Sequence, residues 1–236
     1  MKTSTIMVIT AVLITLGSLT AFNINVKKVY QKGDFKSRFK EMGFSPLKGV
    51  ENIEIKSADR MTVRLEQGDK EGIWIGNAEK EHLSSHFEGN TLVLDLSAEA
   101  ITTGYRSWAE IIIISKTLKA VNLRTTQAKD SKEDFGNGEI RFYGYHLDQL
   151  NLQVGKMVNA ELNKMQIHTL RADLGNQKDG KAMLTISSDS KINTAEFNVP
   201  GRSTLQLYNP DLVKAVYNLS DSATVTLSGK VVKMIK

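Results

Sequence analysis

The chain has 236 residues, of which 41% are hydrophobic and 24% charged, with 3 prolines and 17 glycines. These proportions are those of a globular protein and exclude collagen-like and wholly disordered chains. The absence of cysteine excludes disulfide frameworks, thiolate zinc sites, iron–sulfur clusters and cysteine nucleophiles. It leaves the compartment open, because a chain with a large core needs no disulfides outside the cytoplasm.

An uncharged run near the N-terminus predicts a membrane segment. Residues 6–22 carry no charge, and as a helix they would cover about 25 Å, close to the lower limit for a membrane span. The alternative is a cleaved signal peptide, for which Ser18 and Thr20 form a passable cleavage site. Because the apolar run is longer than the usual core of about 7–15 residues in a signal peptide, we favour an uncleaved anchor over residues 1–23.

Residues 24–47 are expected to form a basic linker. The lysines and arginines in this stretch are opposed by Asp34 and Glu41 alone, and they account for the excess positive charge of the chain. They either rest on anionic lipid headgroups or belong to a solvated tether, and we favour the tether. The positive-inside rule applied to these residues would keep the rest of the chain in the cytoplasm. Long domains translocate largely regardless of charge, so we expect the remainder to be extracytoplasmic. Since the excess charge is not on a repeating face, we expect no nucleic-acid partner.

Beyond residue 48 the sequence predicts an all-β domain, 48–236. Apolar residues alternate with polar ones in short runs, which is the pattern of half-buried strands. Four segments share one apolar spacing and begin at Leu118, Leu147, Ile167 and Ile192, and a second strand lies between successive copies. Two short strands in each repeat of about 20–25 residues are typical of a β-solenoid, and a β-sandwich of short strands is the alternative.

Stacked coils would align the repeated apolar residues in inward columns. A slip of one residue would turn every apolar side chain outward, so the pattern fixes the register. The first expected column is Val121, Leu150, Leu170 and Ala195, and the second is Leu123, Leu152, Ala172 and Phe197. On the second strand of each coil, the expected outward residues are Arg141, Glu161, Thr185, Gln206 and Thr226.

The order of these features resembles a known family. A hydrophobic N-terminal segment is followed by VENIEIKSADRMTVRLEQGD, HFEGNTLVLDLS, EIIIISKTLKAVNL and then the coil repeats. This order is similar to that of the auto-transporter adhesin head domain, or GIN domain, of bacterial envelope proteins. The resemblance covers roughly residues 45–230. It implies a right-handed β-solenoid anchored at the bacterial inner membrane and exposed to the periplasm, or secreted if the signal is cleaved. The family has no assigned catalytic residues, so none are carried over.

The search for catalytic and metal-binding residues argues against an enzyme. His82 and His86 are four residues apart, but the expected strand or loop would not bring their rings together as a helix would. A polysaccharide-active β-helix enzyme, the alternative function, needs paired carboxylates, and the expected outward columns show none. That enzyme would need Asp130, Glu133 or Asp134 to fold back beside the coils. We therefore expect no catalytic residues, no metal site and no cofactor.

Aromatic side chains are the remaining candidates for a binding site. Tyr105 and Trp108 lie in an expected loop, and Tyr143 and Tyr145 flank a glycine just after a strand, while Tyr208 is a further candidate for sugar stacking. These residues either bind a partner or cap the open end of the core. The sequence thus predicts a non-enzymatic, membrane-anchored scaffold that contacts an envelope protein, a polysaccharide or the cell wall.

Overall fold

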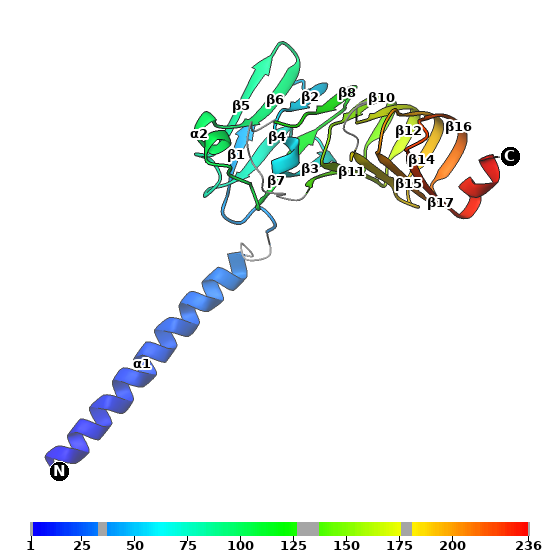
Figure 1. The fold of residues 1–236 in the computed structure, drawn as a ribbon. Helices are drawn as coiled ribbons and strands as arrows, with labels where there is room; N and C mark the ends of the chain where they lie inside the picture. The colour runs from blue at the N-terminus through cyan, green and yellow to red at the C-terminus, as the bar shows by residue number, and fades with distance from the viewer. Residues whose placement is uncertain (1, 33–36, 127–136, 176–180, 236) are drawn as a thin grey trace. The chain divides into compact units, whose positions relative to one another are not determined.

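A computed structural model describes residues 2–32, 37–126, 137–175 and 181–235 and divides the chain into two units, Met1–Met42 and Gly43–Lys236 (Figure 1). The first unit contains α1, Thr3–Lys32, whose part Thr3–Lys28 is long and apolar enough to cross a membrane. The hydroxyls of Thr10, Thr15 and Thr20 each donate to the carbonyl oxygen four residues earlier. The helix extends into the expected linker, because residues 23–32 contain neither glycine nor proline.

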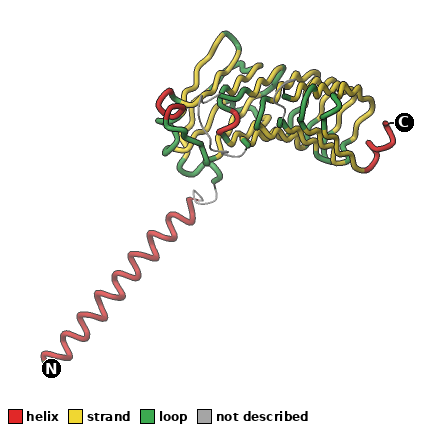
Figure 2. The backbone as a smooth tube through the Cα atoms, in the orientation of Figure 1, coloured by secondary structure: helices red, strands yellow, loops and turns green. Residues whose placement is uncertain are grey.

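The second unit is mostly β, as the sequence predicts, and Figure 2 shows its strands in yellow. Two short helices accompany the early strands, η2 (Ala58–Arg60) and α2 (Ala98–Thr102), and η3 (Gly229–Ile235) ends the chain. The strands of sheet A, in spatial order, are β1 (Met42–Pro46), β4 (Gly72–Gly76), β7 (Glu110–Ser115), β3 (Thr62–Gln67), β9 (Gly138–Tyr143), β11 (Val158–Asn163), β13 (Met183–Ile186), β15 (Thr204–Tyr208) and β17 (Thr224–Ser228). Those of sheet B are β16 (Asp211–Leu219), β14 (Lys191–Val199), β12 (Gln166–Leu174), β10 (His146–Val154), β8 (Ala120–Leu123), β2 (Asn52–Ile55), β6 (Thr91–Leu96) and β5 (Leu83–Glu88).

The β unit consists of two mixed sheets. The β-solenoid that the sequence predicted is not confirmed. From β8 and β9 onward, successive strands alternate between the sheets and pair in parallel. The earlier strands break this order, since β2 and β3 are inserted beside β8 and β9. Two pairs, β4 with β7 and β5 with β6, are antiparallel. The β5–β6 pair forms a hairpin whose tight turn uses Gly89 at φ +64°, a backbone conformation that glycine adopts without strain.

The expected inward columns are buried, with one error of register. Leu150 pairs with Leu170, and Leu170 with Ala195, as predicted. Val121, however, pairs with Leu152 rather than with Leu150. The shift is two residues, which keeps the apolar side chains on the inner side of the sheet, so apolar spacing alone could not detect it. The position of β8 along β10 is fixed by backbone hydrogen bonds such as that from Asn151 N to Lys119 O, at 2.9 Å.

Tyr145, one of the proposed binding residues, belongs to the core. Its side chain is fully buried, and its hydroxyl lies 2.8 Å from Ser115 Oγ. Burial raises the pKa of the Tyr145 hydroxyl, so the group stays neutral. A buried phenol needs a hydrogen-bond partner, and Ser115 supplies it. Tyr145 therefore offers no surface to a partner protein or polysaccharide.

Close backbone packing at Gly138 joins β9 to η2. A Cβ at Gly138 would lie 1.7 Å from the carbonyl oxygen of Ala58, and the three nearest atoms are all backbone atoms of Ala58 and Asp59, which cannot move aside as a flexible side chain could. Any side chain at this position would push η2 off the strand.

We therefore expect Gly138→Ala to lower the free energy of unfolding of the β unit by about 2 kcal/mol or more. The matched control is Gly76→Ala, whose Cβ would meet Glu79 Cγ at 3.5 Å and Ala109 Cβ at 3.8 Å, which are ordinary contacts. Denaturant unfolding of each variant, solubilised in detergent, measures its free energy of unfolding relative to the wild type. Equal stability of the two variants would contradict the packing described for Gly138.

Candidate functional site

The outer face of sheet A is the candidate binding surface. Along its strands every second residue is buried, and the residues between them point to the opposite side of the sheet. Parallel pairing aligns these outward residues in rows that step from strand to strand by about 4.8 Å. The first row is Glu139, Asn159, Met183, Thr204 and Thr224, the second is Arg141, Glu161, Thr185, Gln206 and Thr226, and the third contains Tyr143, Asn163, Tyr208 and Ser228.

The second row contains the residues that the sequence predicted to point outward, in the predicted register. Arg141 pairs with Glu161, which pairs with Thr185. Gln206 and Thr226 continue the row on β15 and β17. The prediction succeeded here because apolar and polar residues alternate along these strands.

Arg141 is the centre of an ion-pair cluster on this face. Its guanidinium contacts Glu139, lies 3.6 Å from Glu110 Oε1 and lies 3.9 Å from Glu161 Oε2. On the neighbouring strand, Arg64 pairs with Glu66. The sequence analysis missed this convergence because Glu110 precedes the repeats and joins the sheet only through β7.

Tyr143 lies at the other end of the same strands. Its ring stacks against the Arg64 guanidinium, whose carbon is 3.9 Å from the ring centroid. Guanidinium groups are attracted to aromatic faces, so the contact holds the ring in place. Of the four proposed binding residues, Tyr143 is the one that lies within the outer face of sheet A.

The far half of the face is uncharged. Thr185 Oγ1 and the Tyr208 hydroxyl both donate to Gln206 Oε1, each at 3.2 Å. Tyr208 is 45% exposed, so part of its ring is available for contact although its hydroxyl is hydrogen-bonded. Tyr208 and Tyr143 lie in one row, three strand spacings or about 14 Å apart.

Tyr105 and Trp108, the other two candidates, follow α2. The Tyr105 hydroxyl donates to Glu79 Oε2 at 2.7 Å, and its ring lies 4.1 Å from that of His82. Burial and the neighbouring carboxylate raise the pKa of Tyr105 to about 12. Tyr105 is thus a half-buried packing residue. Trp108 is 78% exposed with Arg106 over its ring, and it remains available to a partner.

The described residues contain no group of three or more histidine, cysteine or acidic side chains able to hold a metal ion. His82 stacks on Tyr105, whereas His86 lies 3.1 Å from Glu88 on β5, so the two imidazoles have different partners. Asp130, Glu133 and Asp134, which the alternative enzyme would require, lie outside the described residues.

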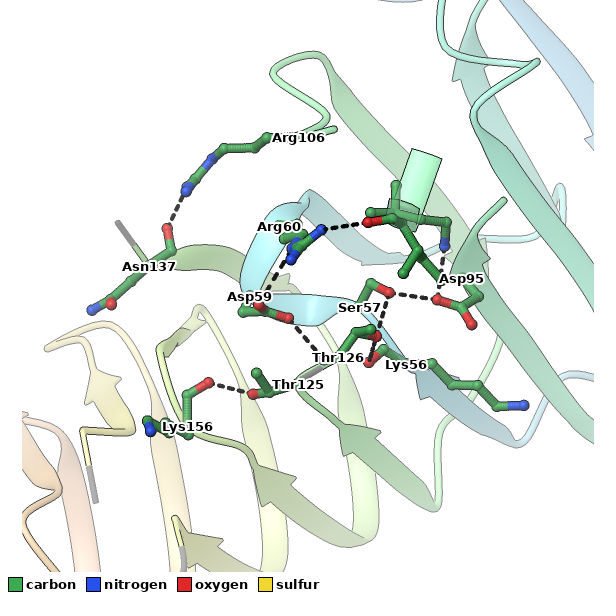
Figure 3. Close-up of polar contacts among 12 residues, drawn as sticks. Lys56, Ser57, Asp59, Arg60, Asp95, Arg106, Thr125, Thr126, Asn137 and Lys156 are labelled. Atoms are coloured by element: carbon green, nitrogen blue, oxygen red, sulfur yellow. Dashed lines mark hydrogen bonds and ion pairs between the residues drawn. The ribbon is translucent and has the colours of Figure 1, made fainter. Parts of the chain in front are cut away.

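A buried polar cluster joins the irregular first strands (Figure 3). The Ser57 hydroxyl donates to Asp95 Oδ1 at 2.5 Å and lies 2.7 Å from Thr126 Oγ1. Thr126 N donates to Asp59 Oδ1 at 3.2 Å, and Arg60 Nε lies 3.8 Å from Asp59 Oδ2. Ser57 is fully buried, so the cluster holds η2 against β6 and the end of β8 and does not face a substrate.

Burial of Asp59 makes the cluster sensitive to pH. Desolvation raises the pKa of the Asp59 carboxyl above its usual value, although Thr126 N and Arg60 act in the opposite direction. A carboxyl with a raised folded-state pKa contributes stability below its unfolded-state pKa, and this contribution is lost as pH rises through the folded-state value.

We expect the free energy of unfolding of the wild type, minus that of Asp59→Asn, to decrease between pH 3 and pH 7. Asparagine keeps an oxygen for Thr126 N and does not titrate, so the difference isolates the carboxyl. Denaturant titrations of both proteins in the same detergent measure it. A difference that increases with pH would mean that the pKa of Asp59 is lowered by its neighbours.

Comparison with known proteins supports the fold. No family model matches the chain, and no curated protein matches it. A solved structure from Bacteroides fragilis, named provisionally as an adhesin, has a TM-score of 0.51 at 12% identity over 78% of this chain and 94% of its own. Another, from Parabacteroides distasonis and named provisionally as a lipid binding protein, has a TM-score of 0.35 at 14% identity over 79% and 97%. The first likeness shows a shared fold, and fold alone does not define a ligand.

Proposed function

We propose that this chain is a non-enzymatic binding protein of the bacterial cell envelope, anchored by α1, with the outer face of sheet A as its contact surface. The observation that supports this most is the alignment of outward residues in rows on strands held in register from both sides. Ion pairs and hydrogen bonds already fix the side chains of this face, so little side-chain entropy is lost when a partner binds.

The same proposal includes the family and the regular part of the fold. We infer that the chain is a divergent GIN-type protein, and that β8–β17 form solenoid-like coils with the early strands covering one end. The fold shared with the structure named as an adhesin supports this inference without extending to function. Adhesion to a polymer or a protein would need a rigid face rather than a pocket, which agrees with the arrangement of sheet A.

A polysaccharide-active enzyme is the second candidate, because three carboxylates contact Arg141. Glycosidases need two carboxyl groups about 5–9.5 Å apart, one of which must carry a proton. A guanidinium favours the charged form of the carboxylates that it contacts. We therefore regard the cluster as structural. Release of reducing sugar that is abolished by Glu110→Gln or Glu161→Gln would support the enzyme instead.

Replacing a threonine of the outer face with arginine should weaken binding to the envelope. We expect Thr185→Arg to reduce co-sedimentation of the detergent-solubilised chain with purified cell envelopes by about tenfold, because a bulky charge would break the flat second row. The control is Thr194→Arg on β14 of sheet B, a threonine of similar partial exposure. Equal loss in both variants, or no loss in either, would argue against this face.

The anchor can be tested separately from the binding face. We expect the chain to keep its N-terminal segment in the membrane fraction, because the apolar stretch of α1 is longer than a signal-peptide core. Mass spectrometry of the membrane-bound protein should give the full mass. Protease added to intact spheroplasts should digest the β unit, and full protection would place that unit in the cytoplasm.

A further inference from the structure

The third row of sheet A combines two aromatic rings with an unsatisfied amide. Tyr143 and Tyr208 mark positions about 14 Å apart in this row, and Asn163 lies between them on β11. Asn163 is only 8% exposed, and its Nδ2 has no hydrogen-bond partner among the described residues. That nitrogen has almost no exposed surface, so the contacts available to a ligand in this row are the two aromatic rings.

The second row beside it presents donors and acceptors in alternation. Arg141 is a donor, Glu161 an acceptor, and Thr185, Gln206 and Thr226 can be either, with one group on each strand. A chain of hydroxyl groups can both donate to and accept from such a row. Its repeating units would meet a repeating set of protein groups about 4.8 Å apart.

Resting on the binding role proposed above, we propose that the outer face of sheet A binds a neutral polysaccharide, which runs across the strands from Tyr143 to Tyr208. The two tyrosine rings stack against sugar rings, and the second row contacts the hydroxyl groups. An anionic polymer is disfavoured because the charged half of the face has four carboxylates against the two guanidinium groups of Arg64 and Arg141. The far half of the face is uncharged, so a neutral polymer fits both halves.

The surface fits a polysaccharide better than a protein partner. Protein interfaces are centred on buried apolar or aromatic anchors that fill pockets. The outward rows on β9, β11, β13, β15 and β17 are mostly polar, with Met183 as their one aliphatic side chain among the described strand residues. The larger exposed aliphatic residues of the described β unit lie on β16 of sheet B and on η3, and they are Val213, Val216, Leu219 and Val232.

Affinity electrophoresis of the full chain in detergent tests this directly. The gels contain barley β-glucan, pullulan or glycol chitin, and we expect at least one of them to retard the wild type. Tyr143→Ala combined with Tyr208→Ala should raise the apparent dissociation constant about tenfold or more, since each aromatic contact contributes modestly. Tyr208→Ala alone should give a smaller rise. Because that ring is half-exposed, its removal leaves the core intact and keeps the test valid if the double variant unfolds.

The controls separate the ligand from the site. Phe87→Ala on β5 removes an aromatic of matching exposure, 43%, from sheet B and should leave retardation unchanged. Retardation by none of the three polymers, or equal retardation of wild type and Tyr208→Ala, would overturn the proposal. If envelope binding still depended on Thr185, the binding role would stand with a protein partner. If envelope binding also did not depend on Thr185, both the binding role of this face and its polysaccharide ligand would be contradicted.

Discussion

Register between parallel strands is the constraint on which this structure depends. From β8 to β15 nearly all apolar residues of each strand lie on one side, and a slip by one residue would expose them. Burial of apolar surface therefore fixes the strands relative to one another, as seen in the columns through Leu150, Leu170 and Ala195. Because side chains alternate along a strand, fixing the inner columns also fixes the outer rows.

The outer rows consequently behave as one surface rather than as independent side chains. Arg141 meets three glutamates from three strands because those strands are held in register. Exposed ion pairs of this kind add little stability, so their value lies in holding side chains in place. A face ordered in this way presents its side chains in a fixed, repeating arrangement.

The early strands add a second kind of contact to these columns. β2 and β3 continue the columns in parallel register with β6, β8, β7 and β9, but the chain between β2 and β8 also forms a hairpin, two short helices and two antiparallel pairs. Polar contacts hold these irregular segments, with Ser57 bonded to Asp95 and Asp59 bonded to Thr126 N. Buried polar groups are favourable only when they are paired, so this cluster specifies one arrangement of the loops. Close packing of Gly138 on Ala58 also fixes η2 against β9, because only a residue without a side chain fits there.

The sequence by itself determined the apolar N-terminal helix, the β class and the inward or outward side of most residues from β9 onward. These follow from composition and from alternation, which are local properties. The tertiary structure alone decided the two-residue register of β8, the burial of Tyr145 and the meeting of Glu110 with Arg141. Each of these depends on which strands become neighbours. A shift of two residues preserves alternation, and residues far apart in the chain meet only after the sheet has formed, so no local pattern records them.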